Sequence, residues 1–192
     1  MTDESSTPAR RVLLLFAHPA LERSRVHRRL LAEARTMPGI TVHDLYEAYP
    51  DFDVDVRREQ ALLAAHDVLV VQCPFYWYST PALVKQWQDL VLEHGWAYGR
   101  EGTALTGKCW LQIVSAGGGA NAYTPGGRNR MSVAQLLAPL ENTALLCRMQ
   151  WLPPHVIHGT HAMTPTDIEA EAVRYRGLLA SLVQGARQEL QA

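Results

Sequence analysis

Short, continuously apolar segments, each followed by an amphipathic helical pattern, constrain the fold of this chain more than any other feature. The clearest three lie at residues 11–17 (RVLLLFA), 67–73 (DVLVVQC) and 108–116 (KCWLQIVSA). Continuous apolar runs of this length are typical of strands that are covered on both faces in a parallel sheet. A weaker, alternating segment at 40–45 (ITVHDL) predicts another strand, and a fifth is expected within 155–159 (HVIHG).

Helical patterns fill the intervals between these strands. They cover residues 24–37, 55–67, 81–94, 132–147 (with an interruption near Pro139) and 164–190. Ser24 is placed to cap the first helix, and Thr166 or Asp167 lies near the start of the last. Five β-α repeats with short connections predict one α/β domain over residues 11–192, with an open five-stranded parallel sheet and helices on both faces. Residues 1–10 are polar and aperiodic, which predicts a flexible tail.

Charge and cysteine usage narrow the classes of function. Eighteen Lys and Arg against nineteen Asp and Glu give a formal net charge of -1. This balance exerts no general attraction on phosphate backbones or anionic lipid, so no nucleic-acid partner is expected. No segment approaches the roughly 20 apolar residues that cross a bilayer. Cys73, Cys109 and Cys147 form no C-x-x-C pair, which favours a reduced, cytoplasmic protein.

Three loops are expected to form the ligand site. In an open parallel sheet, ligands bind outside the carboxyl ends of the strands, near the reversal of strand order. The loops that follow the first, third and fourth strands are 18–24 (HPALERS), 74–79 (PFYWYS) and 116–127 (AGGGANAYTPGG). We therefore expect these three loops to converge at one edge of the sheet.

The first loop contains neither G-x-G-x-x-G nor a P-loop, so it does not predict a dinucleotide pyrophosphate site. It still supplies a helix N-terminus, the hydroxyl of Ser24 and the nearby His18 and His27, which together suit a single terminal phosphate. The alternative interpretation is that Ser24 only caps the helix and the two histidines are surface residues.

Four consecutive aromatic residues, Phe75 to Tyr78, follow the third strand. Neighbours on an extended chain face opposite ways, so four rings cannot all enter one core. Core packing combined with a dimer interface remains one interpretation. The other is a planar ligand with a phosphate tail, its plane along the aromatic segment and its polar edge against Ser115 to Gly118. Flavin mononucleotide (FMN) has that shape.

Three histidines spaced by three, His155, His158 and His161, raise the question of a metal site. On a strand, a spacing of three sends adjacent members to opposite faces, and Pro153-Pro154 disfavours a helix here. No Asp, Glu or Cys completes a ligand set nearby, so we predict no metal.

Longer strings then carry a family resemblance over nearly the whole chain. They are AHP (17–19), LYEAYPDFDVDV (45–56), PFYWYSTPALVKQW (74–87), HGWAYGREGTALTGK (94–108), SAGGG (115–119) and WLPPHVIHGT (151–160). In these strings the chain resembles the flavodoxin-like NAD(P)H:quinone oxidoreductases, and among them the ancillary subunits of glutathione-gated potassium-efflux systems.

The resemblance implies a homodimer with one flavin per subunit at the dimer edge. It favours FMN over FAD, because the similarity is to the shorter members of the family, and leaves FAD as the alternative. It assigns cofactor contacts to three groups: His18, Ser24, Arg25, Val26 and His27 for the phosphate and ribityl chain; Phe75, Tyr76, Trp77 and Tyr78 for the ring; Ser115, Ala116, Gly117 and Gly118 for its polar edge. The same resemblance makes Tyr123 and Arg128 the candidate catalytic residues.

Three positions depart from the family pattern. His27 stands where relatives commonly carry Asn, Ser115-Ala116 where they often carry Thr-Thr, and Arg128 near the place of a histidine that partners the tyrosine. Arginine stabilises an anion but is no proton relay at neutral pH.

Two functions follow from the resemblance. The first is two-electron transfer from NAD(P)H through FMN to a quinone. The alternative is a flavin-binding regulatory subunit that docks on the cytosolic domain of a potassium-efflux antiporter at the inner face of the membrane, with weak or no quinone turnover. A flavodoxin-like electron carrier is a third option, which the implied nicotinamide and quinone pocket disfavours.

Overall fold

Five parallel strands form one sheet in the order β2-β1-β3-β4-β5. Their bounds are β1 Val12–Phe16, β2 Ile40–Asp44, β3 Val68–Pro74, β4 Cys109–Ser115 and β5 Gln150–Ile157. The computed structural model describes residues 9–185, so residues 1–8 of the predicted tail and 186–190 of the last predicted helix lie outside the described part. The order reverses between β1 and β3, which is where ligands bind in such sheets.

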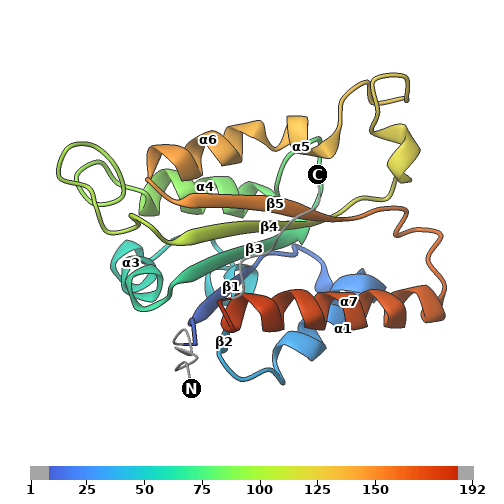
Figure 1. Cartoon of the computed structure of the whole chain (residues 1–192), viewed down its shortest axis with the longest axis horizontal. Helices are drawn as coiled ribbons and strands as arrows, with labels where there is room; N and C mark the ends of the chain where they lie inside the picture. The colour runs from blue at the N-terminus through green and yellow to red at the C-terminus, as the bar shows by residue number, and fades with distance from the viewer. Residues whose placement is uncertain (1–8, 186–192) are drawn as a thin grey trace, which may run out of the picture.

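Helices cover both faces of the sheet, as predicted (Figure 1). The α-helices are α1 Arg25–Ala34, α2 Leu45–Ala48, α3 Val56–Ala65, α4 Ala82–Val91, α5 Val133–Leu136, α6 Ala138–Leu146 and α7 Pro165–Val183, and the 3-10 helices are η1 Leu21–Arg23 and η2 Ala120–Ala122. Helices α1 and α7 pack on one face, and α2 to α6 pack on the other. Within residues 9–185, no helix is both long and apolar enough to cross a membrane.

Strands β1, β3 and β4 are buried along their whole length. On β1, Leu13 and Leu15 enter the core beneath α2 to α6, while Leu14 and Phe16 enter the core beneath α1 and α7. Full burial stabilises each such side chain by roughly 1.5–3 kcal/mol. The continuous apolar runs are therefore explained by burial on two faces, and the carboxyl ends of these strands are held in fixed positions.

Strand β5 begins at Gln150, so the prediction of a strand within 155–159 was wrong about its start. Pro153 and Pro154 lie inside this strand. In a central strand, proline would interrupt the hydrogen bonds between neighbouring strands, because it has no backbone N–H. Strand β5 lies at the edge and pairs only with β4, so part of its backbone makes no ladder hydrogen bond. An edge strand tolerates proline for this reason.

Helix boundaries differ from prediction at three places. Helix α2 was missed because it has only four residues; Asp44 caps it by accepting hydrogen bonds from the backbone N–H groups of Tyr46 and Glu47. The helix predicted over 132–147 is divided into α5 and α6 near the predicted break. The last helix begins one residue after its cap Thr164. Thr164 Oγ1 accepts the backbone N–H of Asp167, and the Asp167 carboxylate accepts the backbone N–H of Thr164, which completes a capping box.

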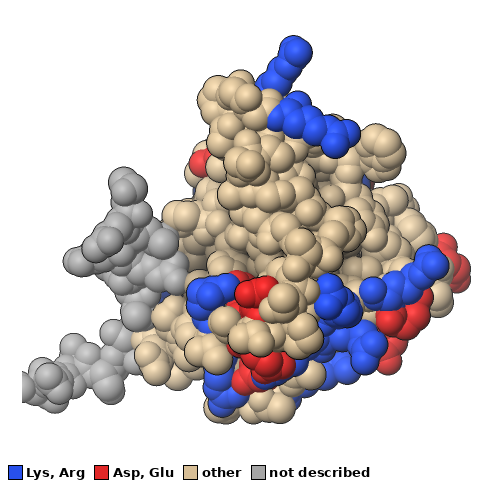
Figure 2. All heavy atoms as spheres, turned by 90° about the vertical axis from the view of Figure 1, so that its right-hand side faces the viewer, with Lys and Arg blue, Asp and Glu red and all other residues tan. Residues whose placement is uncertain are grey.

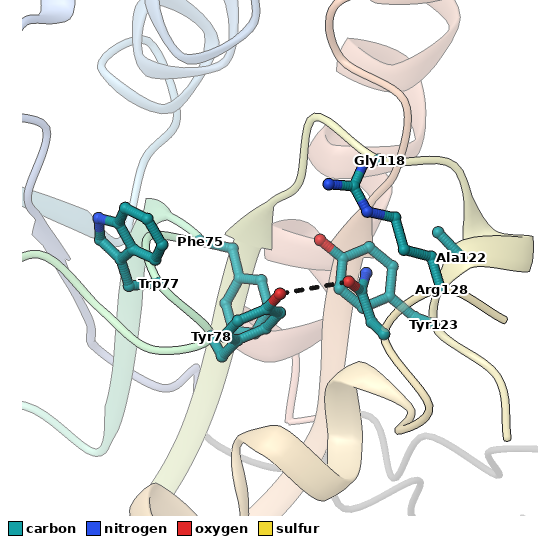
Figure 3. A pocket seen from close by; sticks show the side chains of 8 residues that line it. Phe75, Trp77, Tyr78, Gly118, Ala122, Tyr123 and Arg128 are labelled. Atoms are coloured by element: carbon teal, nitrogen blue, oxygen red, sulfur yellow. Dashed lines mark hydrogen bonds between the residues drawn. The ribbon is translucent and has the colours of Figure 1, made fainter.

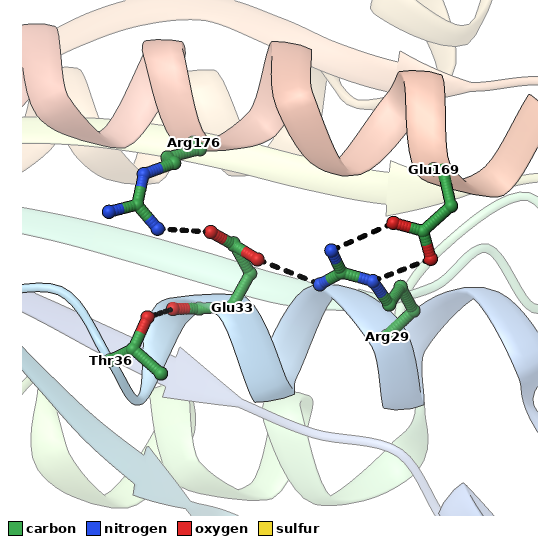
Figure 4. A network of polar contacts seen from close by, with 5 residues as sticks. All are labelled: Arg29, Glu33, Thr36, Glu169 and Arg176. Carbon is green, nitrogen blue, oxygen red and sulfur yellow. Dashed lines mark hydrogen bonds and ion pairs between the residues drawn. The ribbon is translucent and has the colours of Figure 1, made fainter.

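Ion pairs join α1 to α7 at the surface (Figure 4). The Arg29 guanidinium donates to both carboxylate oxygens of Glu169, at 2.8 and 2.9 Å, and to Glu33 at 2.8 Å. Glu33 also accepts from Arg176. Exposed pairs contribute little individually, but this network links the two helices whose N-terminal ends lie beside the site.

Glu59 is the centre of a buried polar cluster on the face of the sheet that α2 to α6 cover. Its carboxylate is fully buried and accepts hydrogen bonds from His43 Nε2 at 2.8 Å, the Tyr49 hydroxyl at 2.6 Å and Trp87 Nε1 at 2.9 Å. Burial raises the pKa of this carboxyl, but the hydrogen bonds outweigh burial and leave the pKa below its usual value. The cluster joins β2, α3 and α4, and α4 directly follows the aromatic segment.

Substituting Glu59→Gln is expected to lower the free energy of unfolding by about 3 kcal/mol, because a neutral amide cannot serve three buried donors. Urea denaturation measures this change. The exposed Glu47→Gln serves as the matched control and should change stability by less than about 0.5 kcal/mol. Equal losses in the two variants would contradict a stabilising role for the buried cluster.

Candidate functional site

The carboxyl ends of the strands meet at one edge of the sheet, on the right of Figure 1 and facing the viewer in Figure 2. Two neighbouring pockets open there and share Phe75. The first, here called the α1-end pocket, has a volume of about 580 Å³. Its walls include His18, Ser24, Arg25, Tyr76, Gly117 and His161. The second, the aromatic pocket, has a volume of about 290 Å³ and includes Trp77, Tyr78, Tyr123 and Arg128. The three loops selected from the sequence therefore do converge.

The N-terminus of α1 provides an anion-binding end to the α1-end pocket. Ser24 Oγ accepts the backbone N–H of His27 at 3.1 Å, which confirms Ser24 as the cap. Within residues 9–185, the backbone N–H groups of Arg25 and Val26 donate no hydrogen bond. Free N–H groups and the helix dipole both favour a negative charge at this place.

The interpretation of His18 and His27 as surface residues is wrong, because they are 8% and 1% exposed. His18 lines the α1-end pocket, and its Nδ1 accepts the Ala20 N–H at 3.1 Å. The His27 ring lies behind it, with ring centroids 5.1 Å apart. His27 Nε2 is 2.7 Å from Ser115 Oγ, so the ring acts on the pocket through Ser115.

A buried chain of hydrogen bonds determines how Ser115 faces the pocket. The Tyr175 hydroxyl donates to Gln72 Oε1 at 2.7 Å, which orients the Gln72 amide so that its Nε2 donates to His27 Nδ1 at 3.1 Å. The neutral His27 ring must then carry its proton on Nε2 and donate it to Ser115 Oγ. The Ser115 hydroxyl keeps its own proton for a ligand. Two of the three departures from the family pattern, His27 and Ser115, are thus direct partners.

The aromatic segment forms a tight turn that exposes its rings. Trp77 and Tyr78 have φ of 49° and 64°, and the Ser79 N–H closes the turn on the Tyr76 carbonyl at 2.9 Å. A left-handed non-glycine residue costs roughly 1–2 kcal/mol, and such strain clusters at functional sites. Tyr76, Trp77 and Tyr78 are 42%, 93% and 50% exposed, so core packing is wrong for these three. Phe75 alone turns inward, edge-on to Tyr123.

The glycines after β4 leave room for two rings. A Cβ at Gly117 would lie 2.3 Å from His161 Nε2, and one at Gly118 would lie 3.2 Å from the Tyr123 ring. Of the predicted cofactor contacts, Ala116 and His27 are absent from the pocket walls, and Ala116 is 1% exposed. The other predicted residues line one pocket or the other.

The loop that follows β5 was not assigned to the ligand site by the sequence analysis. His158 lies against Tyr123, with ring centroids 5.5 Å apart, and its buried Nδ1 has no hydrogen-bond partner within residues 9–185. Burial lowers the His158 pKa, and the nearby Gly118 backbone has a smaller, opposite effect. Thr160 and His161 line the α1-end pocket. The available signal was that this loop also follows a parallel strand and so ends at the same edge.

The three histidines of this segment have separate surroundings. His155 Nε2 hydrogen-bonds to Glu171 at 2.6 Å, on the side of α7. Across the described residues, no three His, Cys, Asp or Glu side chains are grouped to hold a metal ion.

Family comparison matches residues 10–179 to proteins with a flavodoxin-like fold. The chain belongs to this flavodoxin-like family. The glutathione-regulated potassium-efflux system ancillary protein KefG of Pectobacterium carotovorum is 44% identical over 171 residues, which cover 89% of this chain and 93% of that protein.

Two solved structures extend the comparison. General stress protein 14 from Treponema denticola, in complex with FMN, has a TM-score of 0.86 and 40% identity, covering 90% of this chain and 99% of that one. An NADPH-quinone reductase from P. pentosaceus has a TM-score of 0.80 and 32% identity, covering 88% and 96%.

Burial lowers the pKa of His27 from 6.5 to about 3, and the nearby His18 adds to this effect. Unfolding exposes the ring, which then binds a proton below pH 6.5. The stability that neutral His27 contributes is therefore present above that pH and is lost as the pH falls toward about 3.

The wild-type protein should lose unfolding free energy when the pH falls from about 7.5 to about 5. In His27→Asn this loss should be smaller by about 2 kcal/mol, because the variant has no imidazole to protonate at this position. Urea denaturation at the two pH values measures the loss for each variant. Ser115→Ala retains the buried imidazole and should keep the wild-type pH dependence. An unchanged pH dependence in His27→Asn would show that another group causes the acid sensitivity.

Proposed function

We propose that the protein is a flavin-dependent NAD(P)H:quinone oxidoreductase that uses FMN. The observation that carries this proposal is the pair of adjoining pockets, one with an anion-binding helix end and the other walled by aromatic rings. The FMN complex and the NADPH-quinone reductase among the similar structures support it. Bound flavin would supply the redox chemistry by accepting a hydride from the nicotinamide and passing two electrons to a quinone.

The residues of the chain would hold and orient the cofactor. The free N–H groups at the start of α1 would bind the phosphate, and the Ser115 hydroxyl would donate to a polar group of the ligand. The flavin ring would extend from the α1-end pocket past Phe75 and Tyr76 to the edge of the aromatic pocket, which it would leave open for the electron acceptor. Tyr123 and Arg128, which line the same pocket, would place a phenol and a positive charge beside the reacting groups. His158 would hold a neutral imidazole against Tyr123.

A regulatory role is the second candidate. The similar KefG protein is named as an ancillary protein of a potassium-efflux system, which favours docking on the cytosolic domain of such an antiporter. In that role the protein would act at the inner face of the membrane and quinone turnover would be weak. We also propose a cytoplasmic homodimer in which the 93% exposed Trp77 contacts the partner subunit.

Purified protein is expected to carry a yellow chromophore and to oxidise NADH or NADPH when a small quinone is added. Absorbance identifies the flavin, and nicotinamide oxidation measures turnover. Flavin with no turnover, together with binding to a purified antiporter cytosolic domain, would favour the regulatory role. In that case a gain of turnover in Arg128→His would attribute the missing activity to Arg128. A colourless protein that takes up no FMN or FAD would refute both.

The substitution Ser24→Asp tests the phosphate end. Asp is as good a helix cap as Ser, so stability should hold, while a carboxylate near the phosphate should weaken FMN binding about tenfold or more. Riboflavin has no phosphate, and its affinity should change less than twofold. Equal weakening of FMN and riboflavin, measured by fluorescence titration, would contradict this placement.

A further inference from the structure

Arg128 is an unpaired cation at the aromatic pocket. Within residues 9–185 its guanidinium has neither an ion pair nor a hydrogen bond with protein, although it lines the pocket beside Tyr123. No Asp or Glu is among the residues that line this pocket. The loop over residues 116–132 contains Arg128 and Arg130 and no acidic residue. The positive charge at this place is therefore not neutralised by neighbours of its own loop.

The surroundings of Arg128 are largely uncharged. Figure 2 looks at the carboxyl edge of the sheet, where positive and negative side chains alternate over the lower part, on the side of α1 and α7. The upper part, on the side of the loop after β4, is mostly uncharged; projecting Lys and Arg side chains are its most prominent charged groups, and acidic atoms show only at its margin. An anion that approaches the aromatic pocket therefore meets attraction with little competing repulsion.

The pocket walls select flat molecules. Phe75, Tyr78 and Tyr123 lie between Trp77 on one side and Arg128 on the other, as Figure 3 shows. The Phe75 and Tyr123 rings are 6.0 Å apart at their centroids, and Asn129 Oδ1 accepts from the Tyr78 hydroxyl at 3.4 Å. A volume of about 290 Å³ is at the small end for ligand pockets, which suits a molecule of one or two rings.

We propose that the aromatic pocket binds aromatic anions, with a carboxylate or sulfonate paired to Arg128 and the ring plane against the aromatic walls. Guanidinium binds such groups through two parallel hydrogen bonds, which also orients the ring. This inference rests on the proposed function in one respect: the bound anion is the electron acceptor, so acidic quinones and related conjugated acids are the substrate class. Neutral quinones would bind more weakly because they leave Arg128 without a partner.

The preference should be moderate because Arg128 is exposed to solvent. A partly solvated ion pair is worth roughly a threefold to tenfold difference in affinity. It should decrease as salt is added, because ions screen exposed charges. Loss of the charge should remove the preference without affecting the ring contacts.

Two redox-inert probes with the same rings test this proposal. Naphthalene-2-carboxylate and naphthalene-2-carboxamide are titrated by calorimetry into the FMN-loaded protein. The wild type should bind the carboxylate roughly threefold to tenfold more tightly than the carboxamide. Arg128→Gln should bind the two equally, Arg128→Lys should keep part of the preference, and Arg128→Glu should reverse it. Arg130→Gln removes a charge from the same loop outside the pocket walls and should keep the wild-type preference.

Equal affinity of wild-type protein for the two probes would overturn the proposal, as would a preference that survives in Arg128→Gln. Loss of the preference in Arg130→Gln alone would assign the site to the other arginine and also overturn it. If the protein takes up no flavin, the same titration on flavin-free protein still gives the charge preference. Failure of the proposed oxidoreductase function is then distinguishable from failure of this binding site.

Discussion

Burial of β1, β3 and β4 between two helix layers is the constraint on which the rest of the structure depends. Each of these strands places alternate side chains in two separate cores, so it cannot shift by one residue without exchanging them. The carboxyl ends of the strands are therefore fixed to within a residue. Loops of very different composition are brought to one edge because the strands that precede them cannot move.

Two buried clusters of hydrogen-bonded side chains accompany these apolar cores, one on each face of the sheet. Glu59 collects three donors beneath α3 and α4, while the chain from Tyr175 through Gln72 and His27 ends at Ser115 beside the pocket. Buried polar groups need partners, and both sets are satisfied. The second set also affects the pocket, because His27 donates to Ser115 Oγ and so leaves the Ser115 hydroxyl proton free to be donated to a ligand.

Much of the fold could be predicted from local patterns. Continuous apolar runs identified β1, β3 and β4, and the cap at Ser24 located the start of α1. The start of β5 could not be predicted, because Pro153 and Pro154 argue against a strand unless the strand is known to lie at the edge of the sheet. Helix α2 was missed because four residues are too few to show a helical period.

The position of the candidate site in the fold could be predicted from the sequence, but the contacts between its side chains could not. Sequence order and strand polarity alone brought the loops at 18–24, 74–79 and 116–127 to a common edge. The hydrogen bond between His27 and Ser115 joins residues that are 88 positions apart in the sequence, and the contact between Tyr123 and His158 joins residues that are 35 positions apart. Such contacts depend on strand order and on how each loop packs, and no local pattern encodes either. The sequence by itself therefore determined the layers of the fold and the edge that carries the site, because burial and periodicity are local properties. Only the tertiary structure decided which side chains meet there, because that depends on the distances between separate segments.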